Sequence, residues 1–279
     1  MLASAAKTPY WECLAASYRL LGSPFRPISE DLQIYENSVS DWAEARSGGS
    51  IRALVLGSTP GVAEMRWPAG TQVTGVDNSF AMVRTVWPAI ESRPGICASW
   101  AELPFGDHGT DVVIGDGSLN CVRHPEPVAR VCRSLRRVLT PDGLFVLRAY
   151  TRREEPESVD EVFEDMFRGA IPSLTHFKLR LFLAMPQDLR SGAALDDFYA
   201  LWLEHVIDPA CVAQATGWPI EEIKTLSAYG ASSTVHTFPT LAELRRLLSE
   251  YFEECDVVTP NYLLGDRCPI FILRPRRER

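Results

Sequence analysis

Short apolar runs alternate with amphipathic segments through the first half of the chain, and this alternation predicts an α/β fold. Runs with little polar interruption are typical of buried parallel strands. We expect strands at residues 51–57, 72–77, 95–98, 111–116 and 144–150. Helices are expected between them near 60–66, from Ser79 through Trp87, and at about 125–139. Strands joined by such crossovers predict a parallel sheet of right-handed connectivity.

The same alternation resumes near the C-terminus. A helix is expected at 240–252, begun by Thr240, because threonine is a good N-cap residue. Strands are expected near 254–262 and at 268–273. The short link between these two strands leaves no room for a helical crossover, so they should form an antiparallel hairpin at the sheet edge.

Two flanking regions break this rhythm. Residues 8–46 show helical apolar spacing with a break at Gly22-Ser23-Pro24, and they predict either a packing helix or a cap over a ligand. Residues 151–239 are rich in aromatic residues, punctuated by prolines and expected to be mostly helical. We therefore expect an N-terminal helical cap (1–49), a core (50–150), an inserted helical lid (151–239) and a completion of the core (240–279). Ser47-Gly48-Gly49-Ser50 is expected to be a short flexible joint.

Composition narrows the class of protein. With 46% hydrophobic and 23% charged residues, the chain is typical of a globular domain, and its net charge of −8 gives no footprint for nucleic acid. The arginines at the C-terminal end are expected to form a solvated tail (Arg274, Arg276, Arg277 and Arg279). Seven cysteines without a C-x-x-C pair indicate free thiols and no zinc site. No apolar run is long enough to span a membrane, so we expect a cytoplasmic protein.

The turn after the first strand predicts the type of ligand. Gly57 and Gly61 allow a sharp turn and a close approach, and Asp77 ends the second strand, where such folds accept ribose hydroxyls. These features indicate an adenosine-containing cofactor. A nicotinamide dinucleotide needs G-x-G-x-x-G, but Thr59 occupies the place of the middle glycine and Pro60 has no N–H for a diphosphate. A nucleoside cofactor without phosphates fits better.

The order of these features resembles the class I S-adenosylmethionine-dependent methyltransferases over residues 50–150 and 240–274. The stretch AELPF (101–105) with Asp111 and the stretch RRVLTPDGLFVLR (136–148) resemble that family's sequences around strands four and five. Some flanking segments, PFRPISED and RCPIF among them, are similar to uncharacterised bacterial methyltransferase-like proteins. The resemblance implies a Rossmann-like, seven-stranded, mostly parallel sheet with an antiparallel terminal hairpin, and S-adenosyl-L-methionine as cofactor.

Carried over residue by residue, the resemblance implies a cofactor site at the ends of the strands. The residues are Gly57, Ser58, Thr59, Gly61, Asp77, Asn78, Met82, Ser99, Trp100, Asp116, Gly117 and Ser118. The chain departs from the family pattern at Val55, where an acid is usual, and at Thr59 and Ser99.

Candidates for the acceptor side are fewer. Methyl transfer needs alignment above all and a base only for some acceptors, so strong catalytic motifs are not expected. Asp116 is a catalytic candidate or the cap of a turn, and His176 is a catalytic candidate or an ordinary histidine. Substrate-binding candidates are Tyr18, Arg148, Lys178 and Tyr229. The alternative for the two cations is that they are solvated at the surface. Aromatic residues of the insertion are expected to line the pocket or to pack its helices (Phe177, Phe182, Tyr199, Trp202 and Tyr229).

The leading hypothesis is methyl transfer to a nitrogen, oxygen or carboxylate of a small molecule, because a lid excludes large acceptors. One alternative is an enzyme that uses the same cofactor without methyl transfer, for example by cyclising its aminobutyrate arm. Others are a catalytically silent module that binds the cofactor and, more remotely, a dehydrogenase. We expect no metal site, no nucleic-acid partner and no membrane contact, and leave a homodimer open.

Overall fold

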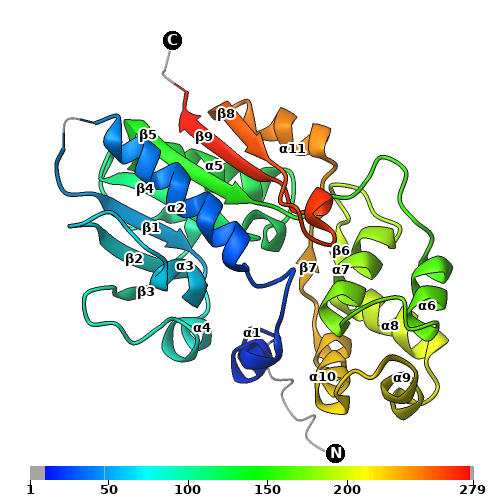
Figure 1. Ribbon diagram of the computed structural model, residues 1–279. Coiled ribbons are helices and arrows are strands. Elements are labelled where there is room, and N and C mark those ends of the chain that lie inside the picture. The colour runs from blue at the N-terminus through cyan, green and yellow to red at the C-terminus, as the bar shows by residue number, and fades with distance from the viewer. Residues whose placement is uncertain (1–9, 47, 277–279) are drawn as a thin grey trace, which may run out of the picture.

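A seven-stranded sheet forms the centre of the computed structural model, which describes residues 10–46 and 48–276. Its strands lie in the order β3-β2-β1-β4-β5-β9-β8 (Figure 1). The first five strands in the chain pair in parallel, and β9 is antiparallel to both β5 and β8. The strands are β1 (Arg52–Leu56), β2 (Gln72–Asp77), β3 (Gly95–Cys97), β4 (Thr110–Asp116), β5 (Leu139–Arg148), β8 (Phe252–Val258) and β9 (Ile270–Pro275). The predicted fold class and the terminal hairpin are confirmed.

Helices connect the strands, and two of them begin at residues whose side chains cap them. Ser79 accepts a hydrogen bond from the Met82 amide, and Thr240 forms a capping box with Glu243. These helices are α3 (Pro60–Glu64), α4 (Phe80–Thr85), α5 (Glu126–Val138) and α11 (Leu241–Leu248). The N-terminal region contributes α1 (Tyr10–Ser17) and α2 (Ser29–Glu44).

The largest difference from an expected strand start is at β5. β5 begins at Leu139, five residues before the expected start at 144, and runs through Pro141 and Gly143, which resemble a turn in the sequence. Thr110 of β4 pairs with Leu139, and the register then shifts before Val112 pairs with Leu144. The extra residues therefore form an irregularity within the strand, as in a β-bulge.

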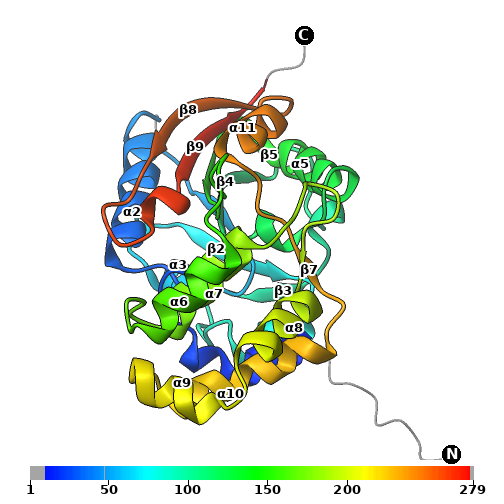
Figure 2. The same ribbon diagram turned by 90° about the vertical axis from the view of Figure 1, so that its right-hand side faces the viewer.

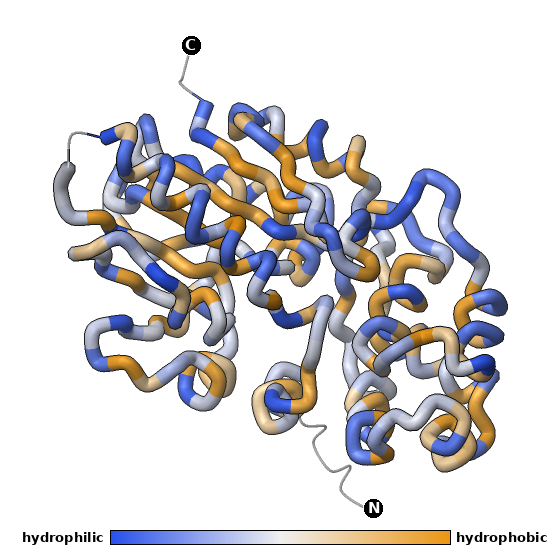
Figure 3. Tube along the Cα trace, in the orientation of Figure 1, coloured by the Kyte–Doolittle hydropathy of each residue, from blue (hydrophilic) through white to orange (hydrophobic). Residues whose placement is uncertain are grey.

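Apolar residues cover both faces of the sheet, whose strands form the hydrophobic centre of the molecule (Figure 3). Along β1, Leu54 and Leu56 belong to the core beneath α5 and α11, while Val55 belongs to the core beneath α2. All three are at most 1% exposed, and burial stabilises each by roughly 1.5–3 kcal/mol. The absence of alternation in this strand follows from burial on both faces.

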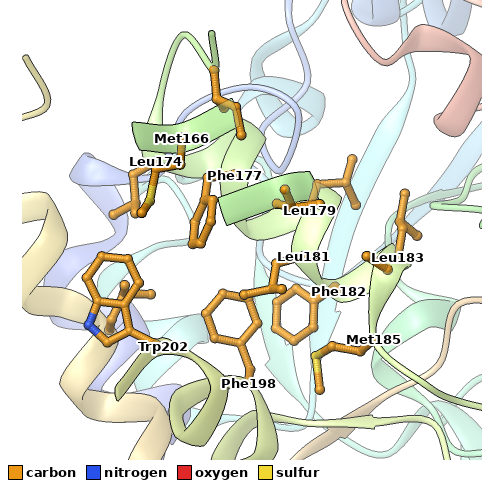
Figure 4. Packing of buried hydrophobic residues seen from close by; sticks show 14 of the residues in the cluster. Met166, Leu174, Phe177, Leu179, Leu181, Phe182, Leu183, Met185, Phe198 and Trp202 are labelled. Atoms are coloured by element: carbon orange, nitrogen blue, oxygen red, sulfur yellow. The ribbon is translucent and has the colours of Figure 1, made fainter. Parts of the chain in front are cut away.

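The insertion has its own core beside the sheet (Figures 1 and 2). It contains α6 (Val159–Phe167), α7 (Leu174–Ala184), α8 (Leu195–His205), α9 (Pro209–Thr216) and α10 (Ile220–Lys224). Phe177 of α7 contacts the rings of Phe163, Phe198 and Trp202 (Figure 4 shows the last two beside it). A short antiparallel pair, β6 (Ala193–Ala194) with β7 (Val235–His236), is present that the sequence pattern does not predict.

Parts of some expectations fall outside the described residues. These are Ser47 of the expected flexible joint, residues 1–9 of the N-terminal cap, and Arg277 and Arg279 of the basic tail.

Candidate functional site

A cavity of about 700 Å³ lies at the carboxyl ends of the parallel strands. On one side it is lined by the loops after β1, β2, β3 and β4, which we call the cofactor side. On the other it is lined by α1, α7 and the segments around β7. Helix α1 contacts α4 of the core and the η4 turn (Thr225–Ala231) of the insertion, so it lies between the two parts (Figure 1).

Asp77 joins two loops of the cofactor side. One carboxylate oxygen accepts the Ser58 amide at 2.9 Å and the other accepts the Ser79 amide at 2.8 Å. Gly57, at the start of the first loop, has a φ of 92°, a conformation that glycine adopts without strain. The carboxylate therefore fixes the loop after β1 against the loop after β2, and its remaining lone pairs can accept from a ligand.

The amides of the loop after β1 are already used within the protein. Gly57 N–H donates to the Val76 carbonyl, Thr59 N–H donates to the Gly57 carbonyl, and Ser58 N–H is bound by Asp77. Pro60 has no N–H. A diphosphate needs several free amides in such a turn, so this loop suits a nucleoside without phosphates better than a dinucleotide.

Trp100 forms a fixed wall of the cofactor side. Its indole nitrogen donates to the Val76 carbonyl at 2.7 Å, and its ring would lie 3.7 Å from a Cβ placed on Gly57. Ser99 caps the turn that carries this tryptophan. A flat aromatic wall beside a tight turn suits the face of a nucleobase.

Asp116 lines the cavity but is held by a buried arginine. Arg148 Nε donates to its carboxylate at 2.5 Å, and the Tyr35 hydroxyl donates to the same oxygen at 3.1 Å. Burial raises the pKa of Asp116, and the facing Arg148 opposes that effect. The carboxylate is thus paired and positioned, and the expectation that it caps a turn is replaced by this ion pair.

Arg148 is fully buried and joins the N-terminal region to the sheet. Its guanidinium also donates to Asp31 of α2 at 2.8 Å and to the Pro24 carbonyl at 2.9 Å. The Tyr262 hydroxyl donates to the second oxygen of Asp31 at 2.8 Å. We call Arg148, Asp116, Asp31, Tyr35 and Tyr262 the buried ion network.

Rings gather on the side opposite the cofactor loops. His236 lies 6.1 Å from Tyr10, 6.2 Å from Trp11 and 5.9 Å from Phe182, measured between ring centroids. We call these residues, with the two further neighbours, the aromatic cluster: Tyr10, Trp11, Phe182, Tyr229, His236 and Phe238. The cluster brings together α1, α7, η4 and the β7 strand, which are far apart in the sequence.

The structure brings most of the expected site residues to the cavity. The lining includes Tyr18, Gly57, Ser58, Thr59, Asp77, Asn78, Met82, Ser99, Trp100, Asp116, Gly117, Ser118 and Tyr229. Of the insertion aromatics, Phe182 and Tyr229 line the cavity, whereas Phe177, Tyr199 and Trp202 pack its helices.

Other expected residues lie outside the lining and need correction. A Cβ on Gly61 would meet Leu32 and Pro27 at 3.6 Å, so this glycine faces the N-terminal segment. Arg148 is enclosed by the buried ion network, and His176 bonds Ser173 at the start of α7. Lys178 is buried, donates to Thr225 at 3.3 Å and lies 5.3 Å over the Tyr229 ring. These cations and this histidine therefore have structural partners in place of a substrate.

Several lining residues are not among the expected site residues. They are Tyr10, Trp11, Phe25, Cys121, His236 and Phe238. The packing of α1 and the insertion against the core brings Tyr10, Trp11 and His236 to the cavity. Within residues 10–46 and 48–276, no group of three or more His, Cys, Asp or Glu side chains is arranged to hold a metal ion.

Comparison with known proteins shows what the core is similar to. Residues 54–147 match the model of a family described as a methyltransferase domain. The CcbJ methyltransferase from Streptomyces caelestis is 15% identical with a TM-score of 0.55, covering 98% of this chain and 100% of that one. A protein described as a putative Zn-dependent alcohol dehydrogenase from Rhodobacter sphaeroides is 13% identical with a TM-score of 0.58, covering 95% and 98%. At such identities these likenesses show the fold alone, and no curated protein sequence matches the chain.

Proposed function

We propose that this chain, which carries a class I S-adenosylmethionine-dependent methyltransferase domain at residues 54–147, methylates a small molecule enclosed between that domain and the aromatic cluster. The observation that carries the proposal is the single cavity that the cofactor loops and the aromatic cluster share. Its volume of about 700 Å³ falls in the range of small-molecule sites, roughly 300–1,000 Å³. The position of α1 and of the insertion on the walls of this cavity supports a small acceptor.

The residues of the cofactor side suit S-adenosylmethionine. Asp77 has free lone pairs for ribose hydroxyls, and Trp100 with Ser99 offers a wall for the adenine. Gly117, at φ 63° after β4, and Ser118 would face the amino-acid end. Bound there, the cofactor supplies a methyl group activated by a positive sulfur.

The chain's own contribution is positioning and exclusion of water. Backbone hydrogen bonds fix the loops after β1 and β2, and the buried ion network fixes the end of β4. A prealigned acceptor and a site without bulk water are the main requirements of an in-line displacement. The predictions of a cytoplasmic location, of no nucleic-acid partner and of a homodimer stay open; within the described residues, no helix is long and apolar enough to cross a membrane.

Calorimetric titration with S-adenosylhomocysteine tests the cofactor side. We expect Asp77→Asn to weaken binding about 10- to 100-fold, because an amide cannot make the same charge-assisted bonds. Asp107→Asn is the matched control, since that carboxylate pairs with Arg137 at the surface and is 70% exposed. Equal affinity in both variants would contradict the assignment of Asp77.

Product analysis tests the reaction itself. Incubation with S-adenosylmethionine and a metabolite mixture should release S-adenosylhomocysteine only when an acceptor is present. Release of methylthioadenosine without an acceptor would instead support cyclisation of the aminobutyrate arm. Cofactor binding without any product would support a silent binding module.

A further inference from the structure

The aromatic cluster is joined rigidly to the cofactor side through Asn120. The Thr237 amide donates to the Asn120 carbonyl at 2.8 Å, and the Asn120 side-chain amide donates back to the Thr237 carbonyl at 2.8 Å. Asn120 belongs to the η3 turn (Leu119–Cys121), which directly follows Gly117 and Ser118. His236, the residue before Thr237, is therefore held next to the loop that ends the cofactor site.

The cluster is uncharged. Outside the cluster, the Asp, Glu, Lys and Arg side chains that line the cavity are Glu12, Asp77, Asp116 and Arg130, and Asp116 is paired with Arg148. The Tyr10 and Tyr229 rings meet edge to face with centroids 5.7 Å apart, and burial raises the pKa of both phenols. Lys178 bonds Thr225 behind the Tyr229 ring and is not part of the lining. Among the described residues, the aromatic cluster offers no cation that could pair with a carboxylate or phosphate on the acceptor.

His236 is the polar group of the cluster with the chemistry of a base. Burial lowers its pKa to about 4, although the Asn120 carbonyl acts in the opposite direction. The imidazole is therefore neutral near pH 7. A neutral imidazole has one ring nitrogen that donates and one that accepts, so His236 can take a proton. The rings around it belong to Tyr10, Trp11, Phe182 and Phe238.

We propose that the acceptor is an uncharged, planar aromatic alcohol that packs within the aromatic cluster, and that His236 takes the proton of its hydroxyl. This inference rests on the proposed function and names its substrate class. The acceptor oxygen forms a bond to the methyl carbon, and the carbon–sulfur bond breaks with its electron pair remaining on sulfur. The hydroxyl proton passes to the free ring nitrogen of His236. The products are an aryl methyl ether, S-adenosylhomocysteine and a protonated imidazole that returns its proton to solvent.

Binding of matched probes tests the substrate class without turnover. Calorimetry on protein saturated with S-adenosylhomocysteine should show 2-naphthol binding at least about tenfold more tightly than 2-naphthoate, because the carboxylate loses its hydration without gaining a cation. Equal or tighter binding of 2-naphthoate, or no binding of 2-naphthol, would overturn the substrate class. Failure of S-adenosylhomocysteine to bind would instead overturn the proposed function, so the two failures are distinguishable.

A pH profile of 2-naphthol methylation tests the role of His236. With His236→Phe, which keeps an aromatic ring, we expect kcat to fall about 10²- to 10⁴-fold near pH 7. It should then rise with pH as free 2-naphtholate replaces the missing base, while the Kd of S-adenosylhomocysteine stays unchanged. His108→Asn is the control, because that histidine is exposed and far along the chain, and its φ of 55° is one that asparagine tolerates. A His236→Phe profile parallel to that of the native protein would overturn the proton transfer, as would absence of methylation of bound 2-naphthol.

Discussion

The cofactor side of the cavity is made by loops that each follow a strand of the sheet, whereas the aromatic cluster is made by α1, α7 and the segments around β7. On the cofactor side, backbone groups and one carboxylate bond each other, as Asp77 does with Ser58 and Ser79. In the cluster, side-chain rings contact one another, and one backbone link to the core is between Asn120 and Thr237.

This difference indicates that cofactor binding and acceptor selection depend on different parts of the structure. A ligand shared by a whole family can be held by loops whose shape depends on the sheet. An acceptor particular to one enzyme can be selected by side chains on helices outside it, which change without disturbing the sheet. The two sides should therefore respond independently to substitution, except at the Asn120–Thr237 link and where the buried ion network fixes the N-terminal region that carries α1.

The largest effect is expected from Arg148→Met, which removes that connection. The change leaves Asp31 and Asp116 buried without their cation, and breaking a buried ion pair typically costs about 3–5 kcal/mol. Urea denaturation should show this loss in the free energy of unfolding. Because the network also holds Pro24, we expect binding on both sides of the cavity to weaken together.

Arg153→Met is the matched control. Its partner is Asp266, and both side chains are more than half exposed, so the ion pair contributes at most about 1 kcal/mol. A similar small loss for Arg148→Met would show that the buried ion network does not hold the two sides together.

The second effect is a pH dependence that belongs to the aromatic cluster. The pKa of His236 is about 4 in the folded protein against its ordinary 6.5, so below pH 6.5 the unfolded chain binds the proton more readily. The neutral His236 makes its full contribution to the free energy of unfolding above pH 6.5. This contribution is lost as the pH falls toward 4. Between pH 6.5 and 4.5 the loss is roughly 2–3 kcal/mol, and His236→Phe should abolish that part of the slope.

The comparison of the native protein with His236→Phe isolates the contribution of His236. Its titratable neighbours change protonation outside the pH range from 4.5 to 6.5, or are present in both proteins. Burial raises the pKa of Tyr10 and Tyr229 well above neutrality and that of Cys121 to about 12, while the pKa of Lys178 falls to about 8. Burial also lowers the pKa of His124 to about 4, but that residue is unchanged in the variant. Denaturation curves of equal slope against pH would contradict a buried, neutral His236.

The cofactor side and the aromatic cluster also differ in how well they can be predicted from the sequence. Strand ends can be located from apolar runs, so Asp77, Ser99, Trp100 and Gly117 can be assigned to one edge of the sheet from the amino-acid sequence alone. Gly61 cannot be separated from them in this way, because only packing shows that it faces Pro27 and Leu32.

On the acceptor side, the sequence pattern favours cations and a histidine on α7. A helix sequence does not tell which face meets a cavity when nearly all its residues are buried, and α7 is such a helix. From the sequence alone, Lys178 and His176 are therefore as good candidates for lining the cavity as Phe182. Phe182 is the residue of this helix that does line it. His236 is one of five histidines without a motif, and the strand that positions it is two residues long.

The smallest effect, and the sharpest test of independence, is expected from Trp11→Ala. Trp11 lies on α1, lines the cavity and contacts the His236 ring, so its loss removes one wall of the acceptor site. We expect 2-naphthol to bind about tenfold more weakly, the equivalent of roughly 1.4 kcal/mol, in line with the loss of an aromatic contact. The Kd of S-adenosylhomocysteine should change by less than about twofold, because the fixed loops of the cofactor side do not depend on this ring.

Phe167→Ala provides the control for loss of an aromatic side chain, since Phe167 is 43% exposed at the end of α6 and outside the cavity. It should leave both affinities unchanged. Asp77→Asn gives the opposite result to Trp11→Ala, weakening the nucleoside far more than the probe. If Trp11→Ala weakened both ligands equally, α1 would act as a general cover of the whole cavity, and the acceptor site would have no separate wall.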